Sequence, residues 1–576
     1  MATFHLSVPL AEPFAPFASP LFSFMGSPLS PLPPMMPHVS PIAPLDADSK
    51  AQSPTQLGTV VLVLHAHLPY VLSHGKWPHG TDWLCEAVAE SYLPLLKVVH
   101  GLVGQGKAPR LTLSLTPVLC EQLRDERFAQ EFAAYCGSKI MMARANALEF
   151  EASGETQLAA VAAFWEAWYS DVLRDFTQTY GGDIVGAFGA LQDAGHLEIL
   201  TCAATHAYLP LLDDDRSARA QIALGVENYR AHFGRAPRGV WLPQCAYRTH
   251  KEEGHRGTAE MLSEAGLGYF IGDGCSNSGE DGATREGYHV SHIVGSSPLG
   301  MVPRATHLSQ NQSGLPYAGD GAYLDFHQRH DPGGHRLWRI TDAVTPGESK
   351  HAYDPAAAQD AVARHAAHFC DCLRGELREG AASQHAANLV CLPLDAEILG
   401  HRWFEGPQWL ACVLTTLAQD ESIATLTAAQ YLEAHPPQRT TEVATSHCEE
   451  TWQAQLAGEP TAWFWDATHA CERTLHDLVT EYGDTTDVLL RALVEQCARE
   501  LLLLQSSDWP ALLATDTARD YATSRATGHL NTFQTLTELA DKVADGESLT
   551  EAEAACLSEI KERDNPFPRL DLNWWV

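Results

Sequence analysis

The sequence predicts an α/β protein in which a parallel sheet closes into a barrel, with a helical insertion and a helical C-terminal domain. From Gly58 onward, short β-branched or apolar runs alternate with long amphipathic stretches, which is the pattern of βα units around a parallel sheet. Several of these runs end in polar residues that could react, and β/α barrels place functional side chains at the C-terminal ends of their strands. These two observations favour a barrel over an open sheet.

The predicted strands are mostly apolar, as expected where helices cover both faces of a sheet. They include residues 59–64, 110–115, 239–242, 268–271 and 388–392. Ala, Glu, Phe and Trp recur at helical spacing over residues 121–180, which predicts the helical insertion. Strand patterning disappears after Gly406, and Leu and Val recur three and four residues apart over 487–505, which predicts the C-terminal helices.

These patterns divide the chain into three parts. Residues 1–57 are expected to form a Pro-rich disordered extension, 58–410 the barrel with its insertion at about 118–182, and 411–576 the helical C-terminal domain. The extension holds about a third of the 34 prolines and almost no basic residues, so it lacks the charged start of a signal peptide. A short docking segment and upstream sequence that is not translated are the alternatives.

Charge and composition exclude several classes of function. A formal net charge of -34 makes the surface repel phosphate backbones and anionic lipids, so we expect no nucleic-acid and no membrane partner. A neutral polyol substrate would not be repelled. No apolar run reaches the roughly 18 residues of a membrane span, and the 14 Cys are scattered without a CxxC pair. This cysteine usage is typical of reduced thiols in a cytoplasmic protein.

The first candidate site follows the first predicted strand, where His65 and His67 stand two residues apart. Side chains two apart in a strand point to the same face, so both rings are expected to converge on one spot. They could bind a metal, donate hydrogen bonds to ligand hydroxyls, or form a purely structural pair. Zinc needs a third protein ligand, and no convincing Asp, Glu or Cys stands beside the pair, which disfavours a metal.

Two further strand ends carry candidate residues. Residues 195–200 run into a segment that contains His206, and residues 239–247 place Trp241 and Gln244 at the end of a strand. A Trp ring is a common platform for sugars, because a sugar's axial hydrogens pack on its apolar face while the hydroxyls seek polar partners. A buried core Trp is the alternative for Trp241.

Asp395 follows the apolar run at 390–394 and is expected to project into the barrel mouth. An apolar rim there would raise its pKa enough to make it a general acid. Glu397, two residues on, could share its face and modulate it. The alternative for Asp395 is a helix N-cap ahead of the next segment.

These motifs resemble, in order, the signature regions of glycoside hydrolase family 57, and in detail those of its 1,4-α-glucan branching enzymes. The resemblance rests on HAHLPY at 65–70, WLCEA at 83–87, YLDFH at 323–327, PGGHR at 332–336, QSSDWP at 505–510 and ERDNPFP at 562–568. It implies a distorted seven-stranded (β/α) barrel and a retaining double displacement without a metal or other cofactor. The implied substrate is an α-glucan such as glycogen, amylose or a maltooligosaccharide.

In that double displacement, one carboxylate attacks the anomeric carbon, and a second protonates the departing oxygen and later activates the acceptor, a sugar 6-hydroxyl. By motif position, the resemblance gives Asp395 the acid/base role and puts Gln244 at the nucleophile position. The residues that it implies as pocket lining or substrate contacts are His65, His67, His206, Trp241, Arg304, Gly319, Trp403 and Asp508. It also implies a mobile loop over residues 272–287, which would exclude water.

Gln244 departs from the family pattern, because a neutral amide has no lone pair basic enough to form a glycosyl ester. Other departures concern the same implied cleft. An expected Ser-Trp-Gly stretch reads SHC at 446–448, Thr517 replaces an expected Gln, and residues 316–320 alter a Tyr-Pro-Gly-Asp turn. Linked changes of this kind favour natural divergence over a single Glu-to-Gln replacement.

Three hypotheses remain open from the sequence. The first is a working branching enzyme or glucanotransferase whose nucleophile is another carboxylate, for example Glu397. The second is a non-catalytic α-glucan-binding or regulatory homologue. The third is a metal-dependent hydrolase that uses His65 and His67. The sequence makes no prediction of the oligomeric state.

Overall fold

The structure is a computed structural model that describes residues 56–249, 255–273, 292–294, 299–305, 316–341, 345, 349–382, 388–441, 443 and 450–576. Most of the expected N-terminal extension therefore lies outside the described residues. The same holds for most of the Gly-rich stretch at 272–287, where a mobile loop was expected, and for the SHC stretch at 446–448.

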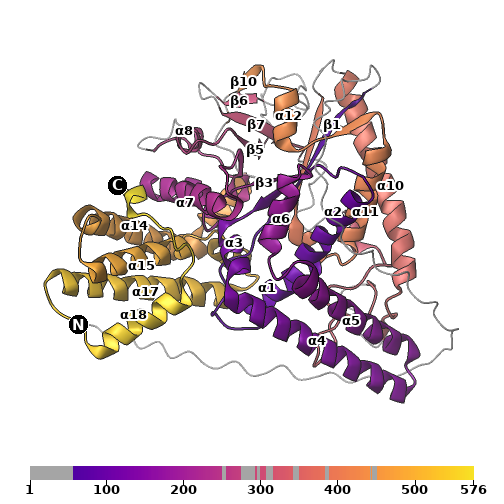
Figure 1. The fold of residues 1–576 in the computed structure, drawn as a ribbon, viewed down its shortest axis with the longest axis horizontal. Helices are drawn as coiled ribbons and strands as arrows, with labels where there is room; N and C mark the ends of the chain where they lie inside the picture. Colours follow the sequence, from indigo (N-terminus) through magenta and orange to yellow (C-terminus); the bar gives the residue numbers. More distant parts are fainter. Residues whose placement is uncertain are drawn as a thin grey trace.

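Seven parallel strands form a nearly closed barrel, which confirms the predicted fold class (Figure 1). They are β1 (Gly58–Ala66), β2 (Leu111–Leu115), β3 (Leu197–Leu200), β4 (Gly239–Trp241), β5 (Tyr269–Asp273), β7 (Gly300–Arg304) and β8 (Leu389–Asp395). Neighbours pair in the order β1, β2, β3 and β4, β5, β7, β8, and β8 returns to β1. A single bridge between Thr201 and Val240 joins β3 to β4 and completes the circle.

The barrel is distorted at the seam between β7 and β8, where the register holds only the pair Arg304 and Cys391. The Ala305 N–H donates to Cys391 O at 2.8 Å. The backbone N–H and C=O groups of odd-numbered residues in β7 therefore point toward β8. Pro303 and Pro393 stand at this seam and have no N–H to donate, which limits the pairing. Pro303 also explains why the sequence did not predict β7 as a strand.

The barrel interior is packed with apolar side chains from alternate strand positions, as a parallel barrel requires. The end of the barrel at which the strands begin is closed by α12 (Ala428–Ala434), which follows the short strand β9 (Ile423–Thr425) beside β1. The Ala428 N–H donates to Thr112 Oγ1 at 3.0 Å, and the Ala429 N–H donates to Glu198 Oε2 at 2.8 Å. Because this end is plugged, only the end at which the strands terminate is left for a site.

The expected all-helical domain from residue 411 is wrong in its first thirty or so residues, because two strands follow that position. β9 pairs with β1, and β10 (Arg439–Thr441) pairs with β6 (His292–Val294). Strands of three residues are too short to show a periodic pattern in the sequence. This segment belongs to the barrel, and the helical part begins later.

The C-terminal helices stack against one side of the barrel (Figure 1). They are α13 (Glu450–Leu456), α14 (Ala462–Tyr482), α15 (Val488–Leu504), α16 (Asp508–Thr515), α17 (Arg519–Ala544) and α18 (Glu551–Arg563). Between β2 and β3 the chain forms the predicted insertion, with α3 (Pro117–Arg124), α4 (Glu126–Ser153) and α5 (Thr156–Arg174). α4 and α5 pack as an antiparallel pair that projects from the barrel, and Gly154 ends α4 with a left-handed φ of 84°.

Further helices cover the outside of the strands. They are α1 (Thr81–Ala87), α2 (Leu93–Gly104), α6 (Ile184–Asp193), α7 (Asp215–Phe233), α8 (Thr258–Glu264), α10 (Pro355–Ala382) and α11 (Gly406–Gln419). Among the residues that the structure describes, no helix is both long enough and apolar enough to cross a bilayer.

Candidate active site at the barrel mouth

The register of the strands places three polar residues, His65, Ser114 and Asp395, in one layer of the barrel. His65 is paired with Ser114 on β2 and with Asp395 on β8. Val61 and Val63 point into the barrel, and side chains alternate along a strand, so His65 points inward at the next position. Paired residues of adjacent strands lie roughly 5 Å apart, which places Asp395 and His65 together at the open end.

His65, His67, His206 and Trp241 form a stack of rings at this end. The His65 ring centroid lies 4.8 Å from Trp241 and 5.0 Å from His206, and the His67 and His206 centroids lie 4.0 Å apart. His65 Nε2 is hydrogen bonded to His206 Nε2 at 3.0 Å. The structure therefore brings together four residues that the sequence placed at three separate strand ends.

The other ring nitrogens of these histidines are also occupied by protein. Their partners are Ser114 Oγ at 3.1 Å from His65 Nδ1, Thr116 Oγ1 at 3.1 Å from His67 Nδ1, Asp508 Oδ2 at 2.8 Å from His67 Nε2, and Ser507 Oγ at 2.9 Å from His206 Nδ1. The predicted sugar contacts thus hold one another in place. Direct contact between their nitrogens and a sugar stays a prediction.

Asp508 and Ser507 show that the C-terminal helices complete this site. No acidic residue stands beside the histidine pair in the sequence, but Asp508, at the start of α16, lies beside His67 although 441 residues separate them. Burial alone would raise the pKa of Asp508, but the adjoining His67 ring, together with hydrogen bonds from Ser506 and the backbone, outweighs burial and lowers it. The carboxylate is therefore ionised where it meets His67.

Burial lowers the pKa of His65 and of His206 well below the usual range, and the neighbouring His67 adds to this effect. Both rings are neutral at pH 7, so one proton between their Nε2 atoms serves both. A metal at this cluster would have to displace the protein partners of these rings.

Within the described ranges, one other group has ligand atoms that converge as in a metal site: Glu500, His529 and Asp564. Arg525 lies 3.1 Å from His529 Nε2, and Arg563 donates to Asp564 at 2.6 Å. Arg525 and Arg563 thus already engage His529 and Asp564, and burial raises the pKa of Glu500 well above its usual range, so the chemistry of this group does not call for a metal ion.

Asp395 has the environment of a proton donor. Its side chain reaches solvent at the open end of the barrel, although protein groups surround it. Burial raises the pKa of Asp395, and the positive charges of Arg402, His67 and Arg304 only partly oppose this. A carboxyl group with a raised pKa that solvent can reach suits general acid/base work.

Glu397 lies next to Asp395 but is engaged by protein. Its Oε1 accepts a hydrogen bond from the His67 N–H at 3.0 Å and a short one from the hydroxyl of Tyr92. Burial raises the pKa of Glu397 to about 7, and the charge of Asp395 contributes further. This side chain ties the end of β8 to the end of β1, which does not suit the alternative role of an attacking nucleophile.

Gln244 lies in the 3₁₀ turn Pro243–Cys245 directly after β4, with a partly buried side chain. Its φ is 55° and that of Cys245 is 53°, both in the left-handed region. His206, after β3, has a φ of 59°. Left-handed residues other than glycine cost about 1–3 kcal/mol each and concentrate at functional sites. Two neighbouring strand ends of the barrel thus carry strained backbone.

The remaining predicted contacts lie in different surroundings. Arg304 ends β7 and is close enough for its charge to act on Asp395. Trp403 is 1% exposed and packs on Tyr323 and Trp409, so in this structure it belongs to the core beneath the mouth. Gly319 lies on an exposed turn with open space around it, and Thr517 is exposed after α16.

Sequence reasoning missed Ser114, Thr116 and Ser507, which hold the histidines. Ser114 and Thr116 end the second predicted strand two residues apart, as His65 and His67 end the first. That shared pattern at adjacent strand ends was the available signal. Ser507 lies inside the QSSDWP stretch, but nothing local points to its contact with His206.

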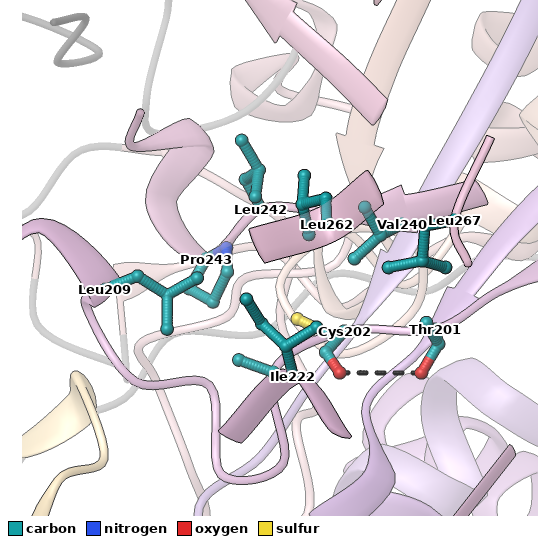
Figure 2. A pocket seen from close by; sticks show the side chains of 10 residues that line it. Thr201, Cys202, Leu209, Ile222, Val240, Leu242, Pro243, Leu262 and Leu267 are labelled. Atoms are coloured by element: carbon teal, nitrogen blue, oxygen red, sulfur yellow. Dashed lines mark hydrogen bonds between the residues drawn. The ribbon is translucent and has the colours of Figure 1, made fainter. Parts of the chain in front are cut away.

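Figure 2 shows a pocket that is not part of this site. It is lined by apolar residues on the helix side of the seam between β3 and β4, among them Val240, Leu242 and Ile222. The inward positions of the same strands include Leu200 and Trp241, which do not line the pocket. The pocket follows from the single bridge at this seam, and it carries no group for acid/base chemistry.

Two family models match the chain. The model of glycosyl hydrolase family 57 matches residues 61–444, and that of the C-terminal region of 1,4-alpha-glucan branching enzymes matches residues 467–575. The first match covers the barrel with its insertion, and the second covers most of the C-terminal helices.

Individual proteins show the same similarity. A 1,4-alpha-glucan branching enzyme of Thermococcus kodakarensis is 35% identical over 538 residues, which cover 88% of this chain and 77% of that protein. The crystal structure of a branching enzyme from Pyrococcus horikoshii is similar with a TM-score of 0.83 and 32% identity, over 90% of this chain and 97% of that one. The crystal structure of the alpha-amylase AmyC from Thermotoga maritima is similar with a TM-score of 0.78 and 27% identity, over 90% of this chain and 99% of that one.

Proposed function

The chain belongs to glycosyl hydrolase family 57, and from this premise we propose that it is a branching-type protein that binds α-1,4-glucan at the barrel mouth. In the proposed reaction, an α-1,4 bond is cleaved and the glucan piece is transferred to a sugar 6-hydroxyl with retention of configuration. The similar proteins named as branching enzymes supply the substrate class, and both matched regions of the chain support it.

The state of Asp395 is the observation that carries this proposal. It lies at the end of β8, in one layer with His65, and burial raises its pKa while solvent still reaches the side chain. Protonated Asp395 would give its proton to the departing glycosidic oxygen. As a carboxylate it would then take the proton of the incoming 6-hydroxyl, so that one residue serves both halves of the reaction.

Gln244 limits the first half of this reaction. Its side chain occupies the place that the family resemblance gives to the attacking carboxylate, and an amide cannot form a glycosyl ester. Glu397 does not replace it, because one of its oxygens already accepts two hydrogen bonds. We therefore expect turnover by this chain to be far below that of its Gln244→Glu variant.

Gln244 also favours a second function, that of a non-catalytic α-glucan-binding homologue. The stacked rings of Trp241 and the histidines are in place, and the backbone at residue 244 keeps its left-handed turn. A cleft that keeps its shape and its acid but has lost the attacking group would still bind a glucan chain.

The test compares the unaltered protein with its Gln244→Glu variant in two assays. Binding is measured by calorimetry with maltoheptaose and by gel electrophoresis with embedded glycogen. Branching is measured by counting new α-1,6 linkages made from amylose. We expect both proteins to bind glucan, and the variant to branch amylose at least about 10³-fold faster, because loss of a nucleophile typically costs that much or more.

Each outcome separates the two functions. Branching by the unaltered protein at a rate close to that of the variant would assign it as a working enzyme and refute the role given to position 244. Binding without turnover in the unaltered protein, with branching restored in the variant, would assign the non-catalytic function. Absence of glucan binding in both proteins would overturn the proposal.

A further inference from the structure

The turn that carries His206 is held in an unfavourable conformation. His206 has a φ of 59° and is buried, and its ring supplies the contact to His65. A left-handed residue of this kind persists only where the surroundings determine it. The His206 N–H donates to Ala203 O at 3.1 Å and the His206 carbonyl accepts from the Ser507 N–H at 3.2 Å, but neither bond holds the N–H of the preceding residue, Thr205.

Gln221, in the middle of α7, is hydrogen bonded to Thr205, the residue before His206. Its Oε1 accepts from the Thr205 N–H at 3.0 Å, and its Nε2 donates to Thr205 Oγ1 at 2.9 Å. The same Nε2 also donates to Gln505 Oε1 at 3.0 Å. The side chain is 0% exposed, and its carbonyl and both N–H bonds are used. A buried amide that uses every group fixes its partners closely.

Gln505 continues this network into the C-terminal helices. Its Nε2 donates to Glu472 Oε1 on α14 at 2.7 Å. Glu472 Oε2 accepts from the backbone N–H groups of Asp213 and Asp214 at 3.0 and 3.2 Å, directly before α7. The bonds therefore form a closed hydrogen-bond ring, which runs from α7 through Glu472 and Gln505 back to α7. This ring joins the barrel to the segment that contains Ser507 and Asp508.

We propose that Gln221 is a positioning residue, which fixes the spacing between His206 and the Ser507–Asp508 segment and thereby the shape of the glucan cleft. The proposal rests on the glucan-binding function proposed above. Gln221 itself does not face the ring stack, so its effect on a ligand passes through Thr205 and Gln505.

Gln221→Leu tests this proposal, because it keeps a similar volume but removes all three side-chain bonds. Asn228→Leu is the matched control. Asn228 is also buried on α7, and its Nδ2 donates to Glu121 Oε1 at 2.6 Å, but it is not part of the ring. Both variants should lower the melting temperature. We expect only Gln221→Leu to weaken the binding of maltoheptaose, by at least 10-fold.

Gln221→Glu gives a readout that a purely structural role would not move. A protonated carboxyl group can accept from the Thr205 N–H and donate to Gln505 Oε1, whereas a carboxylate would repel that oxygen. Glucan affinity of this variant should therefore recover as the pH is lowered from 8 to 5. Glu472 and His206 also titrate near the hydrogen-bond ring. The unaltered protein contains both residues, so its own pH dependence of glucan affinity is the correction.

Hydrogen exchange of the peptide that contains Thr205 and His206 supplies a measurement without glucan. We expect faster exchange in Gln221→Leu than in Asn228→Leu. Equal exchange in the two variants, together with unchanged affinity in Gln221→Leu, would overturn the positioning role. If the unaltered protein binds no glucan, the proposed function fails, while the exchange measurement still decides whether Gln221 holds the turn.

Discussion

Replacement of Glu397 by Gln should stabilise the protein at high pH and have little effect at low pH. Burial raises the pKa of Glu397 from its ordinary 4.5 to about 7. A carboxyl group with a raised folded-state pKa contributes fully to stability below the unfolded pKa, and this contribution is lost as the pH rises through the folded value. Above pH 7, the folded protein must carry a buried charge that costs free energy.

The magnitude follows from the two pKa values. Each pKa unit corresponds to about 1.4 kcal/mol, so the cost reaches about 3.4 kcal/mol at pH 9 and remains below about 1 kcal/mol at pH 5. Glutamine keeps a carbonyl that can accept from the His67 N–H and from Tyr92. The stability gained by Glu397→Gln should therefore grow by about 2.5 kcal/mol between pH 5 and pH 9.

The assay is urea unfolding of variant and unaltered protein at both pH values, followed by tryptophan fluorescence. Glu553→Gln is a control of opposite sign, because hydrogen bonds from Lys542 and Thr550 lower the pKa of Glu553 to about 2. That variant should be less stable by nearly the same amount at pH 5 and pH 9, and the difference should vanish only as the pH falls through about 2. A gain for Glu397→Gln that is the same at pH 5 and pH 9 would show that Glu397 is ionised in the folded protein and refute the reasoning.

Two further substitutions test the site and its support. In the Gln244→Glu background, Asp395→Asn should lower the branching rate by about 10²–10⁴-fold, the usual contribution of a general acid/base, with glucan affinity nearly unchanged in calorimetry; an unchanged rate would refute the acid role. Gly400→Ala should cost about 4 kcal/mol or more in urea unfolding, because Gly400 has a φ of 117° and a β-carbon there would lie 1.8 Å from Glu90 O. Gly375→Ala, in open space on α10, should not destabilise, and equal effects of the two changes would contradict the prediction.

The barrel was predictable because its longer strands have a pattern that can be recognised in the local sequence. β1 and β8 are long, mostly apolar runs that end in polar residues, and that pattern alone placed His65 and Asp395 at the same end of the molecule. β9 and β10 have three residues each and show no period. β7 contains Pro303, which lowers any expectation of a strand.

The partners of the histidines were beyond such reasoning for a physical reason. Asp508 meets His67 across 441 residues, and their contact depends on how the C-terminal helices pack against the barrel. Gln221 illustrates the same limit. A glutamine within an amphipathic helix is expected on the solvent side, and only the fold shows that it is buried and fully hydrogen bonded.

The backbone at Gln244 sharpens the meaning of that residue. Left-handed conformations at Gln244 and Cys245 cost about 1–3 kcal/mol each. The neighbouring strand end carries a third left-handed residue, His206. A carboxylate introduced by Gln244→Glu would thus enter a site whose backbone is already set, with the acid Asp395 in place. If that variant binds glucan but makes no α-1,6 linkages, the missing function lies beyond residue 244, and the departures around it become the residues to restore next.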